Sequence, residues 1–454
     1  MILFFLVLLS SFSIAQNNSD TDSNLSYQLN NKPINPTNTS YKPHVVVAMI
    51  DTGINVYHNE FRRPNLTDHP STYIEGIPSD ATEINLTFSE NYSYNVEHDK
   101  TIWGNIIKKN LYWFPHTNIL GISFAKPTSI LSYLYLGDPI LDEYMHGTAT
   151  SSVVSMINPN CTIVMIEAFP NTFKEALSWA VNQSWIDIID IEFGVVYRPF
   201  IYLELQTQWS GIDEIYKQGM EKGKIIVTPT GNKPWVNTVR SVVSGPPEVI
   251  SVGGAEDFCH GVLLTAAKRG DFVSSFTRLI AWYQNTSLYV PESGTSFSVP
   301  TVVGTISSII LNLREESNYT HGIINNSLIE IPEENKSIKN TDIRDVLNHT
   351  ALYWKTSDWS FSDWIYKSPW FNATNPYTGE QLSPEEKLAI LRVTFTVPVN
   401  PFAPWVQMGW GYVNESIVNE TVDVLMGRKT MPEKPFGAVK YMESLYNNRK
   451  IIWS

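Results

Sequence analysis

Three short segments of the chain carry the residue types of nucleophilic catalysis. Asp51-Thr52-Gly53 follows an apolar run, His146-Gly147-Thr148 opens an apolar helical pattern, and Gly294-Thr295-Ser296 opens another. A serine hydroxyl becomes an effective nucleophile when a positioned imidazole takes its proton, and a carboxylate must hold that imidazole in the right tautomer. Each residue alone has a structural explanation, as a loop cap, a structural histidine or a helix start. Together, Asp51, His146 and Ser296 predict a catalytic triad.

Acyl transfer also needs hydrogen-bond donors for the negative oxygen that develops during the reaction. Asn232 lies just past the apolar run Ile225 to Thr228, so its side-chain amide is the candidate for one donor. A helix that begins at Ser296 would supply another, because its first N–H groups have no partner within the helix. Gly294 would let the substrate approach the backbone closely. We expect these groups to form an oxyanion hole.

These residues need a scaffold that brings distant segments together. Short apolar runs alternate with helical patterns along the chain, which predicts an α/β fold with a doubly wound, mostly parallel sheet flanked by helices. In such a sheet, functional groups gather beyond the carboxyl ends of the strands, where Asp51, Glu192 and Asn232 fall. The expected strands are Val45 to Ile50, Thr162 to Ile166, Trp185 to Ile191, Ile225 to Thr228 and Val249 to Val252, and the expected helices include Phe173 to Val181 and Ile212 to Glu221.

In these segments, and in the chain order Asp, His, Ser, the sequence resembles the subtilisin-like serine proteases. The resemblance covers about residues 43–427. It implies a subtilisin-like peptidase that forms an acyl-enzyme on Ser296, acts on protein or peptide substrates and requires no cofactor. The matching segments outside the triad are His58-Asn59-Glu60-Phe61, Asp187 to Gly194, Asp342 to Ala351 and Gly409 to Asn414.

The resemblance also suggests which residues bind the substrate. Glu192, Phe193 and Gly194 occupy the segment whose backbone would pair with the substrate chain, where the family usually has Ser-Leu-Gly. Glu192 would either favour basic substrates or shift the pH optimum, or it is a solvated or hydrogen-bonded carboxylate without a role in selection. Three other departures remove no catalytic group: Ala149 and Thr150 replace the usual histidine and valine, and Phe297 replaces the commoner methionine.

The composition is typical of a large exported globular protein. With 454 residues, 43% hydrophobic and 17% charged, the chain can bury a sizeable core. Its net charge of -13 disfavours nucleic acid and anionic membrane surfaces as partners, because both repel a negative body. Calcium often stabilises proteases of this family, but no compact run of oxygen ligands marks a site, and no zinc spacing occurs. Cys161 and Cys259 could form one disulfide or stay free.

The ends of the chain differ from its body. Ile2 to Ile14 is an apolar run that ends in small residues, which predicts a signal peptide over residues 1–15 and therefore export. An anchored N-terminus is the alternative, although the run is short for a bilayer, and no later stretch predicts a transmembrane anchor. Numerous Asn-x-Ser/Thr sequons suggest a glycosylated surface, among them those at Asn17, Asn65, Asn85, Asn91, Asn182, Asn285, Asn372 and Asn414.

The body of the chain is expected to be one peptidase domain over residues 43–427. A flexible segment, 16–42, would precede it, and a C-terminal tail, 428–454, would follow and dock on it. Loop-rich insertions are expected between Asp51 and His146 and from about Asn318 to Pro404. The sequence leaves cleavage specificity and oligomeric state open.

The sequence therefore predicts a secreted serine endopeptidase. Two alternatives use the same residues differently: an inactive secreted glycoprotein that binds partners, and an esterase or acyl transferase that keeps the triad. An extended segment beside the nucleophile favours a peptide substrate, because backbone pairing suits an extended chain.

Overall fold

The structure is a computed structural model that describes residues 44–126, 138–192, 210–232, 246–258, 261–264, 270–331, 334–352 and 409–434. All of these residues belong to one compact unit of the chain, Thr39–Ser454. The expected signal peptide, the lead-in to residue 42, Cys259 and most of the C-terminal tail lie outside the described residues.

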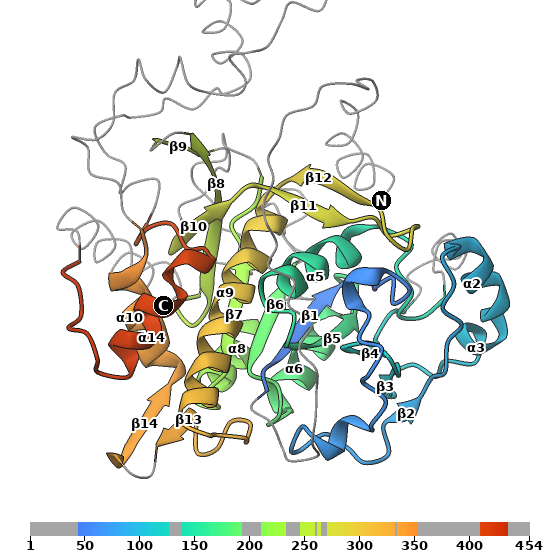
Figure 1. The fold of residues 1–454 in the computed structure, drawn as a ribbon, viewed down its shortest axis with the longest axis horizontal. Coiled ribbons are helices and arrows are strands. Elements are labelled where there is room, and N and C mark those ends of the chain that lie inside the picture. Colours follow the sequence, from blue (N-terminus) through green and yellow to red (C-terminus); the bar gives the residue numbers. More distant parts are fainter. Residues whose placement is uncertain are drawn as a thin grey trace, which may run out of the picture. The chain divides into compact units, whose positions relative to one another are not determined.

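A 10-stranded, mostly parallel sheet organises this unit (Figure 1). The strand order is β10-β8-β7-β6-β1-β5-β4-β3-β2, with β9 paired to β8, and the β3–β4 and β8–β9 pairs are antiparallel. The strands are β1 (Val46–Asp51), β2 (Thr82–Glu83), β3 (Tyr112–Trp113), β4 (Ile119–Ser123), β5 (Thr162–Glu167), β6 (Ile188–Ile191), β7 (Ile225–Pro229), β8 (Ile250–Phe258), β9 (Gly261–Leu264) and β10 (Phe272–Ser275).

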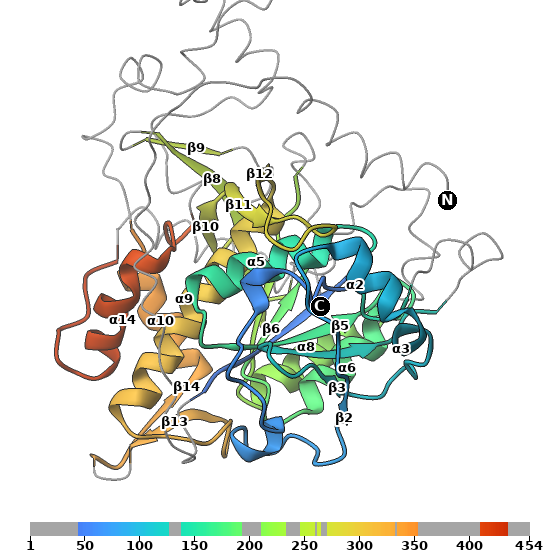
Figure 2. The same ribbon diagram turned by 45° about the vertical axis from the view of Figure 1, so that its right-hand side comes forward.

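Helices cover both faces of the sheet (Figures 1 and 2). α5 (His146–Ile157) and α9 (Thr295–Glu316) pack side by side on one face, while α6 (Phe173–Asn182) and α8 (Ile212–Glu221) lie on the other. Because strand side chains alternate, Val47 and Met49 of β1 pack toward α9, whereas Ala48 and Ile50 pack toward α6 and α8. The prediction of a doubly wound α/β sheet is confirmed.

Smaller elements complete the described fold. Two antiparallel hairpins, β11–β12 and β13–β14, lie outside the main sheet, and α10 and α14 pack against each other. Their bounds are β11 (Thr277–Ala281), β12 (Tyr289–Ser293), β13 (Ser327–Ile331), β14 (Lys336–Lys339), α10 (Asn340–Thr350) and α14 (Val418–Leu425). The remaining helices and 3₁₀ turns are α2 (Tyr92–His98), α3 (Lys100–Gly104), η1 (Asn59–Phe61), η2 (Pro70–Thr72) and η6 (Glu415–Ile417).

α9 is the central helix of the core. Within the described residues it is the one helix long and apolar enough to cross a membrane, but 83% of its apolar window is buried inside the protein. Near its C-terminus, Arg314 forms a fully buried bidentate ion pair with Asp187 at 2.7 and 2.9 Å, and Asp187 also accepts from the Val46 N–H at 2.9 Å. This contact ties the helix to the beginnings of β6 and β1. The ion pair therefore helps to set the orientation of α9, whose N-terminal end carries Ser296.

The expected strands and helices are all present with small shifts of their bounds. Trp185 to Asp187 precede β6, since the strand begins at Ile188. The stretch between Asp51 and His146 is more than a loop-rich insertion, because it supplies β2, β3 and β4 to the main sheet, and β4 pairs with β5 along its full length. All five residues from Ile119 to Ser123 are buried, so this Asn-rich stretch contributes a strand to the core.

Candidate active site

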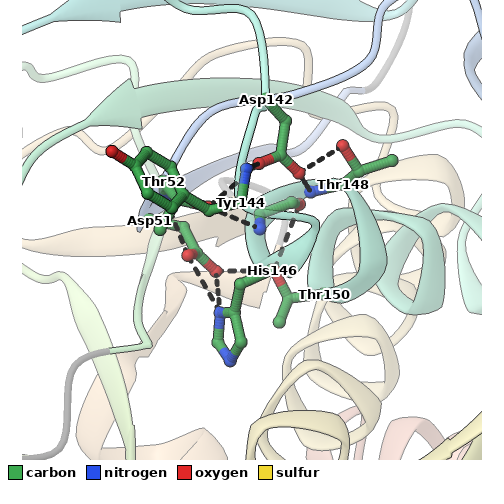
Figure 3. A network of polar contacts seen from close by, with 8 residues as sticks. Asp51, Thr52, Asp142, Tyr144, His146, Thr148 and Thr150 are labelled. Carbon is green, nitrogen blue, oxygen red and sulfur yellow. Dashed lines mark hydrogen bonds and ion pairs between the residues drawn. The ribbon is translucent and has the colours of Figure 1, made fainter. Parts of the chain in front are cut away.

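The first half of the site is a carboxylate–imidazole pair at the end of the central strand. β1 ends at the buried Asp51, and α5 begins at His146, whose side chain is 24% exposed. Nδ1 of His146 lies 2.9 and 3.0 Å from the two carboxylate oxygens of Asp51 (Figure 3). The Thr52 N–H and the Thr150 hydroxyl also donate to this carboxylate, at 2.7 and 2.8 Å. Because the Nδ1 proton faces Asp51, Nε2 keeps the lone pair that can accept a proton.

A second carboxylate holds the start of α5 against the end of β1 (Figure 3). Asp142 accepts from the Thr148 N–H at 2.9 Å, the Thr148 hydroxyl at 2.6 Å and the Thr52 hydroxyl at 3.2 Å. Thr52 in turn accepts from the Gly147 N–H at 3.0 Å. A Cβ atom on Gly147 would lie 2.1 Å from the carbonyl oxygen of Gly53, so the position needs glycine. This close approach brings the imidazole next to its carboxylate.

Opposing influences set the basicity of His146. Burial lowers the pKa of the imidazole, because the protonated ring loses hydration. The negative charges of Asp51, Asp142 and Asp190 raise it, and the resulting pKa lies above the ordinary value of 6.5. The imidazole is therefore a stronger base than a free histidine, and it becomes neutral at a higher pH.

The second half of the site is the first turn of α9. The helix begins at Thr295, directly after the extended N-cap residue Gly294, and Ser296 is its second residue. Asn232, just past β7, accepts at Oδ1 from the Thr295 N–H at 2.8 Å and from the Thr295 hydroxyl at 2.7 Å. With Oδ1 used in this way, the Nδ2 amide is the end of the side chain left to donate. It lies beside Gly294, where a Cβ atom would be 3.4 Å from it.

Two more carboxyl groups lie on β6 and its end, on the face of the sheet toward α9. Asp190 and Glu192 alternate with apolar residues along β6 and its end, and Ile188, two residues earlier, packs in the same apolar cluster as α9. Both carboxyls therefore face the helix that carries Ser296. Burial raises the pKa of each acid well above its ordinary value, and for Glu192 the charges of Asp190 and Asp51 add to the effect. The Ser296 hydroxyl is close enough to lower the pKa of Glu192, although no hydrogen bond of ordinary geometry joins them.

The structure brings the four candidate catalytic residues to one edge of the sheet. Asp51 contacts His146 directly, and Asn232 holds the residue before Ser296. No hydrogen bond joins His146 to Ser296, and the catalytic roles stay predictions. Glu192 is buried and not solvated, and its carboxyl oxygens make no hydrogen bond of ordinary geometry with the described residues, so its part in substrate selection stays a prediction. Phe193 and Gly194, the other candidates for substrate binding, lie outside the described residues.

Sequence reasoning missed two acids of this site. Asp190 has a visible signal, since it and Glu192 alternate with apolar residues in a strand buried on both faces. Asp142 has none, because it lies in an ordinary acidic loop. In the part of the chain that the structure describes, no group of three or more His, Cys, Asp or Glu side chains is arranged to hold a metal ion. Calcium binding stays a prediction without a placed site. Cys161 is buried and Cys259 lies outside the described residues, so their pairing also stays a prediction.

Comparisons with known proteins give similarity in structure alone. No protein-family model and no curated protein sequence matches the chain. Similar solved structures include a lanthipeptide protease (TM-score 0.47, 14% identity, covering 86% of this chain and 89% of that one). A patellamide maturation protease gives a TM-score of 0.41 at 14% identity, covering 86% and 93%. An epidermin leader peptide processing serine protease from Staphylococcus aureus gives 0.42 at 12% identity, covering 84% and 75%. The names of all three describe proteases, but each TM-score is below 0.5 and each identity is below 25%, so these likenesses carry no argument about the activity of this chain.

Proposed function

We propose that the chain is a secreted serine endopeptidase of the subtilisin-like type. The observation that supports this most is the Asp51–His146 pair, which places an oriented base at the same sheet edge as the first turn of α9. An imidazole oriented by a carboxylate, a serine at a helix start and a fixed side-chain amide are the groups that acyl transfer requires.

In the proposed reaction, Nε2 of His146 takes the proton from the Ser296 hydroxyl as Oγ attacks the scissile carbonyl carbon. Asp51 keeps the ring oriented and stabilises the imidazolium that forms. The Nδ2 amide of Asn232 and the Ser296 N–H donate to the oxyanion, and the positive end of the α9 dipole assists them. His146 then gives its proton to the leaving amine, and water releases the acyl group by the same steps in reverse.

The substrate is proposed to be an extended peptide that lies along the chain after β6, at Glu192 to Gly194. Export is proposed from the apolar run that ends at Ala15, and a structural calcium ion remains compatible with the acidic loops. N-terminal sequencing of the protein recovered from the medium tests export: a start at Gln16 supports it, and an intact Met1 in a membrane fraction opposes it.

Digestion of casein by the purified protein tests the proposed activity. The wild-type chain is expected to cut casein, while Ser296→Ala and His146→Ala leave it intact under the same conditions. Hydrolysis of a p-nitrophenyl ester without any cleavage of casein would assign the site to an esterase or acyl transferase. Folded wild-type protein that cleaves neither would contradict the proposal and favour a binding glycoprotein.

A further inference from the structure

The carboxyl groups of Asp190 and Glu192 lack what buried polar groups normally have. The two residues are 0% and 6% exposed, and none of the four carboxyl oxygens makes a hydrogen bond of ordinary geometry with the residues that the structure describes. Buried polar atoms in folded proteins are almost always bonded, and an unpaired buried charge is costly. Ionising both of two adjacent buried carboxyl groups is costly, because their negative charges repel each other. One retained proton removes that conflict.

The position of the pair connects it to the proposed reaction. The Glu192 N–H donates to the carbonyl of Ile50, so Glu192 lies beside the end of β1. The charges that act on Asp190 come from Asp51 on β1 and His146 on α5, besides Glu192 itself. From α9, the group that faces Glu192 is the Ser296 hydroxyl. The charge of the pair therefore acts on both Ser296, the proposed nucleophile, and His146, its proposed base.

We propose that Asp190 and Glu192 share one proton, and that Ser296 reacts efficiently only while Glu192 keeps this proton. A neutral Glu192 leaves the oxyanion hole without an opposing charge. When the pair loses its proton to solvent, a full negative charge appears next to the oxygen that must itself become negative. One charge about 4 to 6 Å away, at an effective dielectric constant of about 20, corresponds to a loss of roughly 10²- to 10³-fold in rate.

This inference rests on the proposed function and adds a positioning role to it: Asp190 acts through Glu192. A lone carboxyl at 192 loses its proton more readily than one that faces a neighbouring carboxylate. Removing Asp190 should therefore bring the alkaline loss of activity to lower pH. Making residue 192 permanently neutral should move that loss to higher pH. The two substitutions act in opposite directions, which a general weakening of the site would not produce.

The test is the pH profile of kcat/KM on a quenched peptide for the full chain and for Glu192→Gln and Asp190→Asn. The pH at which activity is lost on the alkaline side is expected to be at least about one unit higher in Glu192→Gln and to be lower in Asp190→Asn. Glu167→Gln is the matched control, because Glu167 is a buried carboxyl at the end of β5, on the other side of β1. It should leave the limb in place. Alkaline limbs at the same pH in wild type, Glu192→Gln and Asp190→Asn would overturn the proposal.

A second measurement needs no proteolysis and keeps the two proposals separate. The infrared difference spectrum in D₂O at pD 7 between Ser296→Ala protein and the same protein with Glu192→Gln and Asp190→Asn added should show the C=O band of a protonated carboxyl. The contribution of Glu167, which is partly protonated at this pD, is the same in both proteins and cancels. If the wild type is inactive and the band is present, the proposed function fails and the shared proton stands. If casein is cut but no such band appears at this pD, the shared proton is refuted and the protease remains. Circular dichroism at each pH confirms that every variant is folded.

Discussion

Replacing Glu167 by glutamine should stabilise the protein at alkaline pH and not at acidic pH. Glu167 is 5% exposed and lies at the end of β5, next to Asp51 in the sheet. Burial raises its pKa from 4.5 to about 7, while the Ile140 N–H, which donates to it at 2.9 Å, counteracts part of the rise. The folded pKa is above the unfolded one, so the folded state binds the proton more tightly. The stability linked to Glu167 is therefore complete below about pH 4.5 and is lost as the pH rises through 7.

The size of the effect follows from the shift. A rise of about 2.5 pKa units corresponds to about 3 kcal/mol between the protonated and ionised forms. Glutamine stays neutral and keeps an oxygen for the Ile140 N–H, so it should recover most of that free energy at pH 8. The assay is urea unfolding of Glu167→Gln in the Ser296→Ala background, which prevents self-digestion, at pH values from 4.5 to 8. A difference from the parent that is the same at pH 4.5 and at pH 8 would refute the reasoning.

Three further substitutions test the geometry of the site. Gly147→Ala should lower the free energy of unfolding by about 3 kcal/mol in urea, because its Cβ would meet the Gly53 carbonyl oxygen; an unchanged midpoint would contradict that contact. Thr150→Val removes a donor to the buried Asp51, so we expect a loss of about 1 kcal/mol in the same assay, whereas Thr150→Ser should lose less. Asn232→Ala should lower kcat on the order of 10²- to 10³-fold with little change in KM; a change confined to KM would remove Asn232 from the oxyanion hole.

Much of the fold follows from local patterns. The run Val46 to Ile50 is apolar at every position, which indicates a strand buried on both faces, and β1 has that environment. The carboxyl ends of parallel strands meet at one edge of a sheet, so the position of Asp51 and Asn232 at the ends of two apolar runs predicts that both lie at that edge. The core strand β4 was hidden, because its apolar residues lie in an Asn-rich stretch whose composition is typical of loops.

The supporting contacts of the site could not be found in this way. Asp142 accepts a hydrogen bond from Thr52, 90 residues earlier in the chain, and no local sequence pattern predicts such a pairing. Thr150 looks like a neutral replacement in the sequence, yet its hydroxyl donates to Asp51. Side chains that act across distant segments depend on tertiary packing, which spacing and hydrophobicity do not encode directly.

The most direct test of the central claim is to find which residue of the protein reacts with a fluorophosphonate probe. The purified chain is labelled near neutral pH, digested and mapped by mass spectrometry, with His146→Ala treated in parallel. We expect one adduct, on Ser296, formed at least about 10³-fold more slowly in the variant that lacks the base. An adduct on another residue, or none on folded protein across acidic and alkaline pH, would contradict the assignment of Ser296 as the nucleophile.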